Sequence, residues 1–252
     1  MNIFVTGIAG FLGGHIAENL ISEGHTVSGC DNLIGGYIEN VPEDAEFFQV
    51  DAIYLNQMKK MTEDIDIIVH TACTAYEGLS VFSPYLVGQN TYQISMATFT
   101  AAAANNVQKV INCSSMARYG QQKETPFRED MTPLPQDPYG IAKLASEETL
   151  KVLSEVHNFE FVNLVPHNII GPRQKYDDPY RNVVSIMINR ILQGKAPIIY
   201  GDGEQKRCFS YIDDCLSCLI PMLDQKNLNK QVINIGPDEE FVTVNKVVEI
   251  CS

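Results

Sequence analysis

The fold is decided by the first 31 residues, MNIFVTGIAGFLGGHIAENLISEGHTVSGCD (Met1–Asp31). Residues 2–6 are apolar and partly β-branched, which predicts a short buried strand. The glycine-rich stretch Gly7–Gly13 then turns the chain into a helix, which Gly24 ends. Residues 26–30 predict a second strand. The stretch therefore consists of a strand, a glycine loop, a helix and a second strand that is followed by a carboxylate.

This arrangement is typical of a dinucleotide-binding unit, although its glycines have the spacing GxxGxxG in place of GxGxxG. Gly7, Gly10 and Gly13 allow a tight turn and a close approach of the backbone to a pyrophosphate, whose charge the helix N-terminus stabilises. Asp31 is placed to accept hydrogen bonds from the adenosine ribose. A glycine trio alone also occurs in ordinary tight turns. The flanking strand, helix and acid favour cofactor binding over that alternative.

Composition limits the class of protein. The chain has 252 residues, 45% of them hydrophobic and 19% charged, which suits a sizeable core with a smaller appendage. No apolar run is long enough for a membrane span, and no signal-peptide pattern is visible, so we expect no membrane partner. The net charge of −13 argues against nucleic acid. Basic residues nevertheless gather between Lys151 and Arg207, which allows a local pocket for a small anionic ligand.

The seven cysteines follow no disulfide framework spacing, which indicates a reducing, cytoplasmic setting. Cys215 and Cys218 are the one close pair. They lie in a helical pattern without a second pair, so we interpret them as buried small residues and expect no metal site.

Strands and helices alternate along the rest of the first half, which predicts an α/β fold with a doubly wound, Rossmann-type parallel sheet. The expected elements are strands at 46–50, 66–70 and 108–113 and a long helix at 84–105. In such a sheet the carboxyl ends of the strands line the cofactor crevice. Asp51 and Thr71–Cys73 follow two of these strands and are therefore expected to face the nucleotide.

Three residues then have the pattern of an acid–base site. Ser114–Ser115 ends the fifth expected strand. Asp137 and Pro138 have the residue types of a helix N-cap and first helical position. Tyr139 and Lys143 lie four apart, hence on one face of that helix. A Lys ammonium beside a phenol would lower the pKa of Tyr139 toward neutrality and make it a usable acid and base, while a Ser hydroxyl holds the substrate oxygen.

Taken with motifs elsewhere, these residues resemble the extended short-chain dehydrogenase/reductases, and within them the nucleotide-sugar epimerases and dehydratases, above all the UDP-glucose 4-epimerase-like enzymes. The resemblance covers the chain throughout. Its motifs are Thr6-Gly7-x-x-Gly10-Phe11-x-Gly13, Asp31-Asn32-Leu33, Asp51, Asn90, Ser114-Ser115-x-x-x-Tyr119-Gly120, Tyr139-x-x-x-Lys143, Asn168-x-x-Gly171-Pro172-Arg173 and Arg207-x-Phe209-x-Tyr211-Ile212-x-Asp214.

The resemblance implies NAD as cofactor and assigns roles to residues. Ser115, Tyr139 and Lys143 are the implied catalytic set, with Lys143 also holding the nicotinamide ribose. The implied cofactor-binding residues are Gly7, Gly10, Phe11, Leu12, Gly13, Asp31, Asn32, Asp51, Ala52, Thr71, Ala72, Asn90, Tyr139, Lys143 and Pro166. The implied substrate-binding residues are Ser115, Tyr139, Asn168 and Arg207, of which Asn168 and Arg207 contact the substrate diphosphate.

We expect residues 1–165 to form the NAD-binding domain and residues 166–252 to form a sugar-nucleotide lobe interleaved with late elements of the sheet. The expected late elements are strands at 159–165, 196–200 and 232–236 and helices at 182–193, 213–223 and from 244 onward. Relatives usually continue beyond this point, so the lobe is expected to be truncated. Arg173, Lys175, Tyr176 and Arg181 either line the sugar pocket or form a solvated mixed-charge loop with Asp177–Asp178. His167 is a weak candidate for a second base and is better explained as loop packing.

The reaction is narrowed by two neutral residues. Family dehydratases carry Asp-Glu just after the triad Ser or Thr, where this chain has Met116 and Ala117, and decarboxylating relatives keep a Glu where Ala117 stands. The resemblance therefore favours epimerisation of a nucleotide sugar, with a UDP-sugar as the expected substrate. A nucleotide-sugar dehydrogenase or reductase, a decarboxylase and a non-catalytic NAD-sensing protein remain as alternatives. The helices at 84–105 and 139–157 imply a homodimer through a four-helix bundle.

Overall fold

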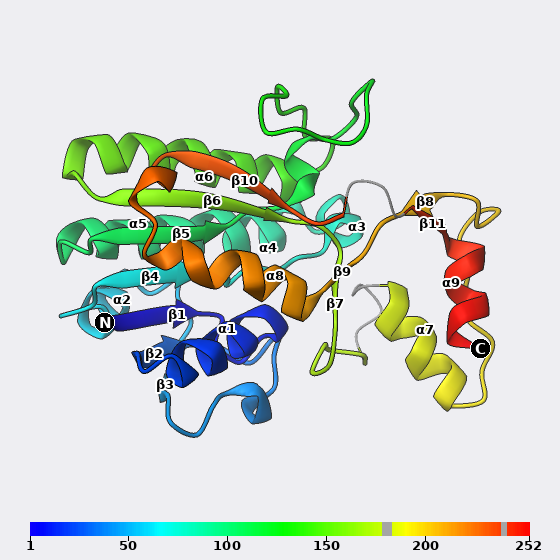
Figure 1. The fold of residues 1–252 in the computed structure, drawn as a ribbon, viewed down its shortest axis with the longest axis horizontal. Helices are drawn as coiled ribbons and strands as arrows, with labels where there is room; N and C mark the ends of the chain where they lie inside the picture. Colours follow the sequence, from blue (N-terminus) through cyan, green and yellow to red (C-terminus); the bar gives the residue numbers. More distant parts are fainter. Residues whose placement is uncertain (178–182, 238–240) are drawn as a thin grey trace.

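The computed structural model describes residues 1–177, 183–237 and 241–252 (Figure 1). Its centre is a seven-stranded sheet of order β10-β6-β5-β4-β1-β2-β3, in which every pairing is parallel. The strands are β1 (Asn2–Thr6), β2 (Thr26–Cys30), β3 (Glu46–Phe48), β4 (Ile67–His70), β5 (Lys109–Cys113), β6 (Glu160–Pro166) and β10 (Gln231–Ile235). The predicted doubly wound parallel sheet is confirmed. Because the strand order reverses between β1 and β4, a crevice is expected beyond the carboxyl ends of these two strands.

Both faces of the sheet are buried, and the alternation of side chains along β1 shows how. Ile3 and Val5 pack on one face with α1 (Phe11–Ser22) and α8 (Ile212–Leu219). Phe4 points to the other face, where α2 (Leu55–Met61), α5 (Ile94–Ala104) and α6 (Pro138–His157) cover it. A parallel strand buried on both faces reads as a continuous apolar run, which is why the strands were visible in the sequence.

The helix expected at 84–105 is one continuous helical stretch with an irregular centre. It consists of α4 (Pro84–Gly88), a π-helical turn (Gln89–Gln93) and α5. The short α3 (Glu77–Ser80) precedes it, and a 3₁₀ turn (Met116–Arg118) follows β5. Along the described ranges, no helix combines the length and apolar character needed to cross a membrane.

A smaller unit lies beyond the carboxyl ends of the strands (Figure 1). It contains α7 (Val183–Leu192), α9 (Val244–Cys251) and the antiparallel pair of β8 (Lys206–Arg207) with β11 (Val242–Thr243), and its apolar centre is formed around Met187, Val244 and Val247. A parallel pair of β7 (Ile169–Ile170) with β9 (Ser210–Tyr211) connects it to the sheet. In contrast, α8 and β10 return to the main core. The part of the chain after β6 thus contributes both to the smaller unit and to the main core around the central sheet.

The strand expected at 196–200 is wrong. These residues pair with no strand among the described residues, and Ile198, Ile199 and Tyr200 stay substantially exposed. Pro197 has no N–H to donate to a neighbouring strand. Two of the apolar residues, Ile198 and Tyr200, line the cavity described below.

Candidate active site

The glycine loop packs its backbone so closely that side chains do not fit. Gly7 has φ +74°, and a Cβ there would lie 2.9 Å from the backbone N of Ala72. A Cβ on Gly13 would lie 2.2 Å from the carbonyl oxygen of Gly7. The loop is tied to the end of β2, because Gly7 N donates to Cys30 O at 2.7 Å. Gly7, Gly10 and Gly13 therefore present backbone without side chains to the crevice, which allows the close approach that a pyrophosphate requires.

Two carboxylates, Asp31 and Asp51, line this crevice at the ends of β2 and β3, where the sequence predicts the adenosine of the cofactor. Asp31 accepts hydrogen bonds from Ala9 N at 3.1 Å and Leu33 N at 2.7 Å. Asp51 accepts one from the side-chain amide of Asn32 at 2.8 Å. A carboxylate oxygen can accept more than one hydrogen bond, so the two acids can also receive ribose hydroxyls. The backbone N–H groups that hold Asp31 fix it in that position.

This end of the crevice predicts a preference for NAD over NADP. The sequence contains no Lys or Arg before Lys59, so nothing in residues 1–58 offers a cation to a 2′-phosphate, and Asp31 would repel it. We expect a calorimetric titration to give an affinity for NAD at least about tenfold higher than that for NADP. Equal or tighter binding of NADP would show that the interpretation of Asp31 is wrong.

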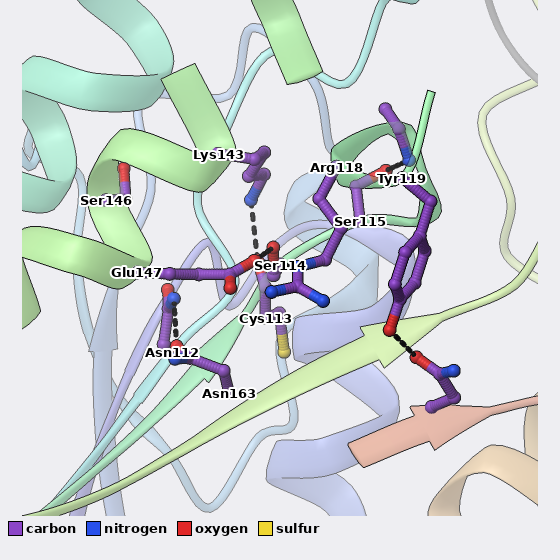
Figure 2. Close-up of polar contacts among 12 residues, drawn as sticks. Asn112, Cys113, Ser114, Ser115, Arg118, Tyr119, Lys143, Ser146, Glu147 and Asn163 are labelled. Atoms are coloured by element: carbon purple, nitrogen blue, oxygen red, sulfur yellow. Dashed lines mark hydrogen bonds and ion pairs between the residues drawn. The ribbon is translucent and has the colours of Figure 1, made fainter. Parts of the chain in front are cut away.

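The three predicted catalytic residues come from β5 and α6. Asp137 caps α6 by accepting a hydrogen bond from Gly140 N at 2.9 Å, with Pro138 as the first helical residue, as predicted. Tyr139 and Lys143 lie one turn apart on the buried face of this helix. Lys143 Nζ donates to the carbonyl oxygen of Cys113 at 2.6 Å (Figure 2). The ammonium is therefore anchored to the end of β5, two residues before Ser115.

The prediction that Lys143 lowers the pKa of Tyr139 toward neutrality is wrong. Burial raises the pKa of Tyr139 well above its usual range, Cys73 and Glu77 raise it further, and the neighbouring Ser115 acts in the opposite direction. The Lys143 ammonium is 5.9 Å from the centre of the Tyr139 ring and donates its hydrogen bond to the Cys113 carbonyl instead. A raised pKa favours the neutral phenol form of Tyr139. The phenol needs an additional positive charge nearby to act as a base.

The glycine loop, the two carboxylates and the three predicted catalytic residues all line one cavity of about 970 Å³. The residues that the family resemblance assigns to catalysis, cofactor binding and substrate binding all line it, and they are Gly7, Gly10, Phe11, Leu12, Gly13, Asp31, Asn32, Asp51, Ala52, Thr71, Ala72, Asn90, Ser115, Tyr139, Lys143, Pro166, Asn168 and Arg207. The cavity runs from the glycine loop, past the carboxyl ends of β4 and β5, to the smaller unit. Its size suits a dinucleotide and part of a second ligand.

Sequence reasoning missed two charged residues of the lining, Glu77 on α3 and Arg190 on α7. Burial within the site raises the pKa of Glu77, Asp137 adds to this effect, and Arg207 opposes it. Arg190 is held by a hydrogen bond from its Nε to Ala196 O at 2.8 Å. Helical spacing could have assigned Arg190 to one face of α7. Which face of α7 meets the cavity, however, depends on how that helix packs on α9. For Glu77 we find no sequence signal.

Two candidates from the loop after β7, Arg173 and Lys175, are not among the described residues that line the cavity. Arg173 pairs with Glu18 on α1, Nη1 to Oε2 at 2.8 Å. Lys175 pairs with Asp177 at 3.4 Å and lies over the ring of Tyr37, while Tyr176 and Asp177 do line the cavity. The described part of the loop therefore combines the two alternatives: its two basic residues form ion pairs, and Tyr176 lines the pocket. Arg181 and Asp178 lie outside the described residues.

His167 also falls outside the cavity lining. Its carbonyl oxygen accepts a hydrogen bond from Ser210 Oγ at 2.9 Å, and its N–H donates to Ile235 O at 2.9 Å. Burial and the neighbouring Arg207 lower the pKa of its imidazole. These contacts match loop packing, as expected.

The fold and the cavity together define a dinucleotide-binding protein of the Rossmann type with Ser115, Tyr139 and Lys143 in the same cavity as the glycine loop. The model of the NAD dependent epimerase/dehydratase family matches residues 3–236. The chain belongs to this family, and its cofactor is NAD.

Individual relatives agree in fold and differ in reaction. The chain is 31% identical to the UDP-N-acetyl-alpha-D-glucosaminuronate decarboxylase of Bacillus cytotoxicus, over 94% of this chain and 75% of that protein. Among solved structures, it is similar to UDP-glucose 4-epimerase of Thermotoga maritima with UDP-glucose, with a TM-score of 0.94, 30% identity and coverage of 100% and 81% of the two chains. It is also similar to UDP-N-acetylglucosamine 4-epimerase of Methanobrevibacter ruminantium in complex with UDP-N-acetylmuramic acid, with a TM-score of 0.91, 35% identity and coverage of 99% and 80%.

Proposed function

We propose that this protein catalyses the NAD-dependent epimerisation of a nucleotide sugar, with a UDP-sugar as substrate. The observation that carries the proposal is the convergence of Ser115, Tyr139 and Lys143 on one cavity that also contains the whole glycine loop. The relatives described above that act on UDP-sugars support this substrate class.

In this proposal each catalytic residue has a defined task. Ser115 holds the hydroxyl oxygen of the reacting sugar carbon, and Tyr139 removes the proton from that oxygen and later returns it. NAD⁺, when bound, supplies the hydride acceptor and a positive charge at this end of the cavity. Lys143, fixed on the Cys113 carbonyl, holds the nicotinamide ribose and adds a second positive charge close to the phenol.

The neutral residues after Ser115 support epimerisation over elimination. Met116 and Ala117 form the 3₁₀ turn after β5, and neither is among the described residues that line the cavity. A methionine and an alanine cannot protonate a leaving hydroxyl. Dehydration is therefore the less supported reaction, and by the same family pattern so is decarboxylation. A non-catalytic NAD-sensing role is less supported because Tyr139 and Lys143 are both present and buried at the site.

The second half of the chain is proposed to hold the nucleotide diphosphate. Asn168 and Arg207 lie at the cavity wall that faces the smaller unit, and the Arg207 guanidinium is exposed and suited to phosphate oxygens. We accordingly assign residues 1–165 to NAD binding and residues 166–252 to the sugar nucleotide. All seven cysteines are free thiols, which supports a cytoplasmic location.

An assay of cofactor balance tests the proposed reaction. An epimerase returns the hydride that it removes, so we expect purified protein to interconvert a UDP-sugar pair with no added NAD or with catalytic amounts only. No net NADH absorbance should accumulate as sugar is converted. If NADH instead grew in proportion to the sugar consumed, the protein would be a dehydrogenase and the epimerase proposal would fail.

A homodimer is proposed on the apolar surface of the two long helices. Phe82, two residues before α4, and Tyr85, in its first turn, are 85% and 81% exposed, and Val152 and Val156 on α6 are 58% and 72% exposed. Large apolar side chains at this density are costly to leave in water. We expect light scattering at micromolar concentration to give twice the chain mass of 28.1 kDa. A monomer mass would refute this assignment.

A further inference from the structure

Arg118 and Glu147 form a buried ion pair next to the three proposed catalytic residues, and the reaction proposed above does not use this pair. Glu147 follows Lys143 by one further helical turn, so Tyr139, Lys143 and Glu147 share one buried face of α6. Arg118 ends the 3₁₀ turn after β5. Glu147 is 3% and Arg118 5% exposed, and Arg118 Nε lies 3.0 Å from Glu147 Oε1 (Figure 2).

The pair completes a set of contacts between the end of β5 and α6. The carbonyl of Cys113 accepts from Lys143, and the hydroxyl of Ser114 donates to Glu147. Two consecutive residues at the strand end thus each contact one turn of the helix, and Ser115 follows them directly in the chain. The helix also approaches this segment closely at its start, where a Cβ on Gly140 would lie 2.6 Å from Ala117 O.

The buried charges of Arg118 and Glu147 stabilise each other. Within the described structure, Nε and Nη1 of Arg118 make no well-aligned hydrogen bond, so the carboxylate of Glu147 is the counter-charge of this guanidinium. Burial raises the pKa of Glu147, while Arg118 and the Ser114 hydroxyl act in the opposite direction and favour the ionised carboxylate. Buried pairs of this kind often contribute little net stability compared with apolar residues of similar volume. Stability alone is therefore a weak reason for this pair to be here.

We propose that Arg118 and Glu147 are positioning residues, whose ion pair fixes the end of β5 against α6 and thereby sets the positions of Ser115, Tyr139 and Lys143. Neither residue is among the described residues of the cavity lining, so they act through these three groups. Ser114 connects the two parts, because its backbone leads directly into Ser115 and its hydroxyl is bound to Glu147.

The decisive variant is the double substitution R118M/E147M, which removes both charges at nearly constant volume. Single substitutions leave one buried charge unpaired and are expected to lower the midpoint of thermal unfolding by about 10 °C. The double variant should unfold within about 5 °C of the parent. Binding of NAD and of ADP, which carries the adenosine and diphosphate but lacks the nicotinamide ribose, is then measured by calorimetry for the folded double variant.

We expect NAD affinity to fall by about tenfold and ADP affinity to change by less than about twofold, because only NAD reaches Lys143. A general loss of structure would weaken both ligands together. The second readout rests on the proposed function: kcat for the UDP-sugar should fall by about 10²-fold with KM changed far less, since small displacements of reacting groups have effects of this size.

The exposed pair of Arg128 and Glu124, 3.4 Å apart, provides a matched control. The variant R128M/E124M should leave both affinities and kcat at parent values. A folded R118M/E147M protein with the parent's NAD-to-ADP affinity ratio and the parent's kcat would overturn the proposal. If the parent itself converted no nucleotide sugar, the proposed function would fail, and the affinity ratio alone would decide the role of Arg118 and Glu147.

Discussion

Replacing Tyr139 by phenylalanine is expected to lower kcat by roughly 10²–10⁴-fold, the usual contribution of a general acid–base group. The substitution removes one hydroxyl and leaves the ring that packs at the start of α6. NAD affinity should stay within about threefold of the parent, because the glycine loop and the two acids of the adenosine end are untouched. Initial rates with a UDP-sugar and calorimetric titration of NAD measure the two quantities.

Tyr119 provides the control for this prediction. It is another buried tyrosine close to Ser115 (Figure 2), but it is not among the described residues that line the cavity, and its hydroxyl donates to Asn234 Oδ1 at 2.8 Å. Tyr119→Phe should cost about 1 kcal/mol of stability and leave kcat within about twofold. Near-normal turnover by Tyr139→Phe would remove Tyr139 from the mechanism and shift attention to a solvent-mediated proton transfer.

The parts of the fold that could be predicted are those that depend on residues close together in the sequence. The strands of the parallel sheet are short apolar runs, and the caps of α1 and α6 depend on single residues such as Gly10 and Asp137. In a doubly wound sheet the carboxyl ends of the strands meet at one edge. For this reason residues as distant as Asp31, Thr71 and Ser115 could be assigned to one site from the sequence.

The parts that were not predictable depend on packing between distant segments. The apolar run 196–200 has the composition of a strand, yet it borders the cavity and pairs with no strand among the described residues. Arg173 has the residue type of a phosphate ligand, yet Glu18 on α1 is within reach and neutralises it. The pKa of Tyr139 depends on how deeply the phenol is buried and on what competes for Lys143. None of these quantities can be read from spacing.

Substituting Gly13 by alanine is the second change with a large expected effect. The added Cβ would lie 2.2 Å from Gly7 O and 2.9 Å from Thr71 Oγ1, and the first of these is backbone that cannot rotate away. The glycine loop must then move off α1, toward the space that the pyrophosphate requires. We expect NAD affinity to fall by more than about tenfold and stability to fall by about 1–3 kcal/mol, as for other overpacked positions.

Gly88 separates this effect from a general response to a lost glycine. It has ordinary helical dihedrals, φ −62° and ψ −43°, and a Cβ there would meet no atom within 4 Å. Gly88→Ala should therefore raise stability by about 0.5–1 kcal/mol and leave NAD binding unchanged. Urea unfolding and calorimetric titration of both variants make the comparison. Parent-like NAD affinity in Gly13→Ala would mean that the loop can widen without loss of the pyrophosphate site, so the close packing of this loop would not be what shapes it for the cofactor.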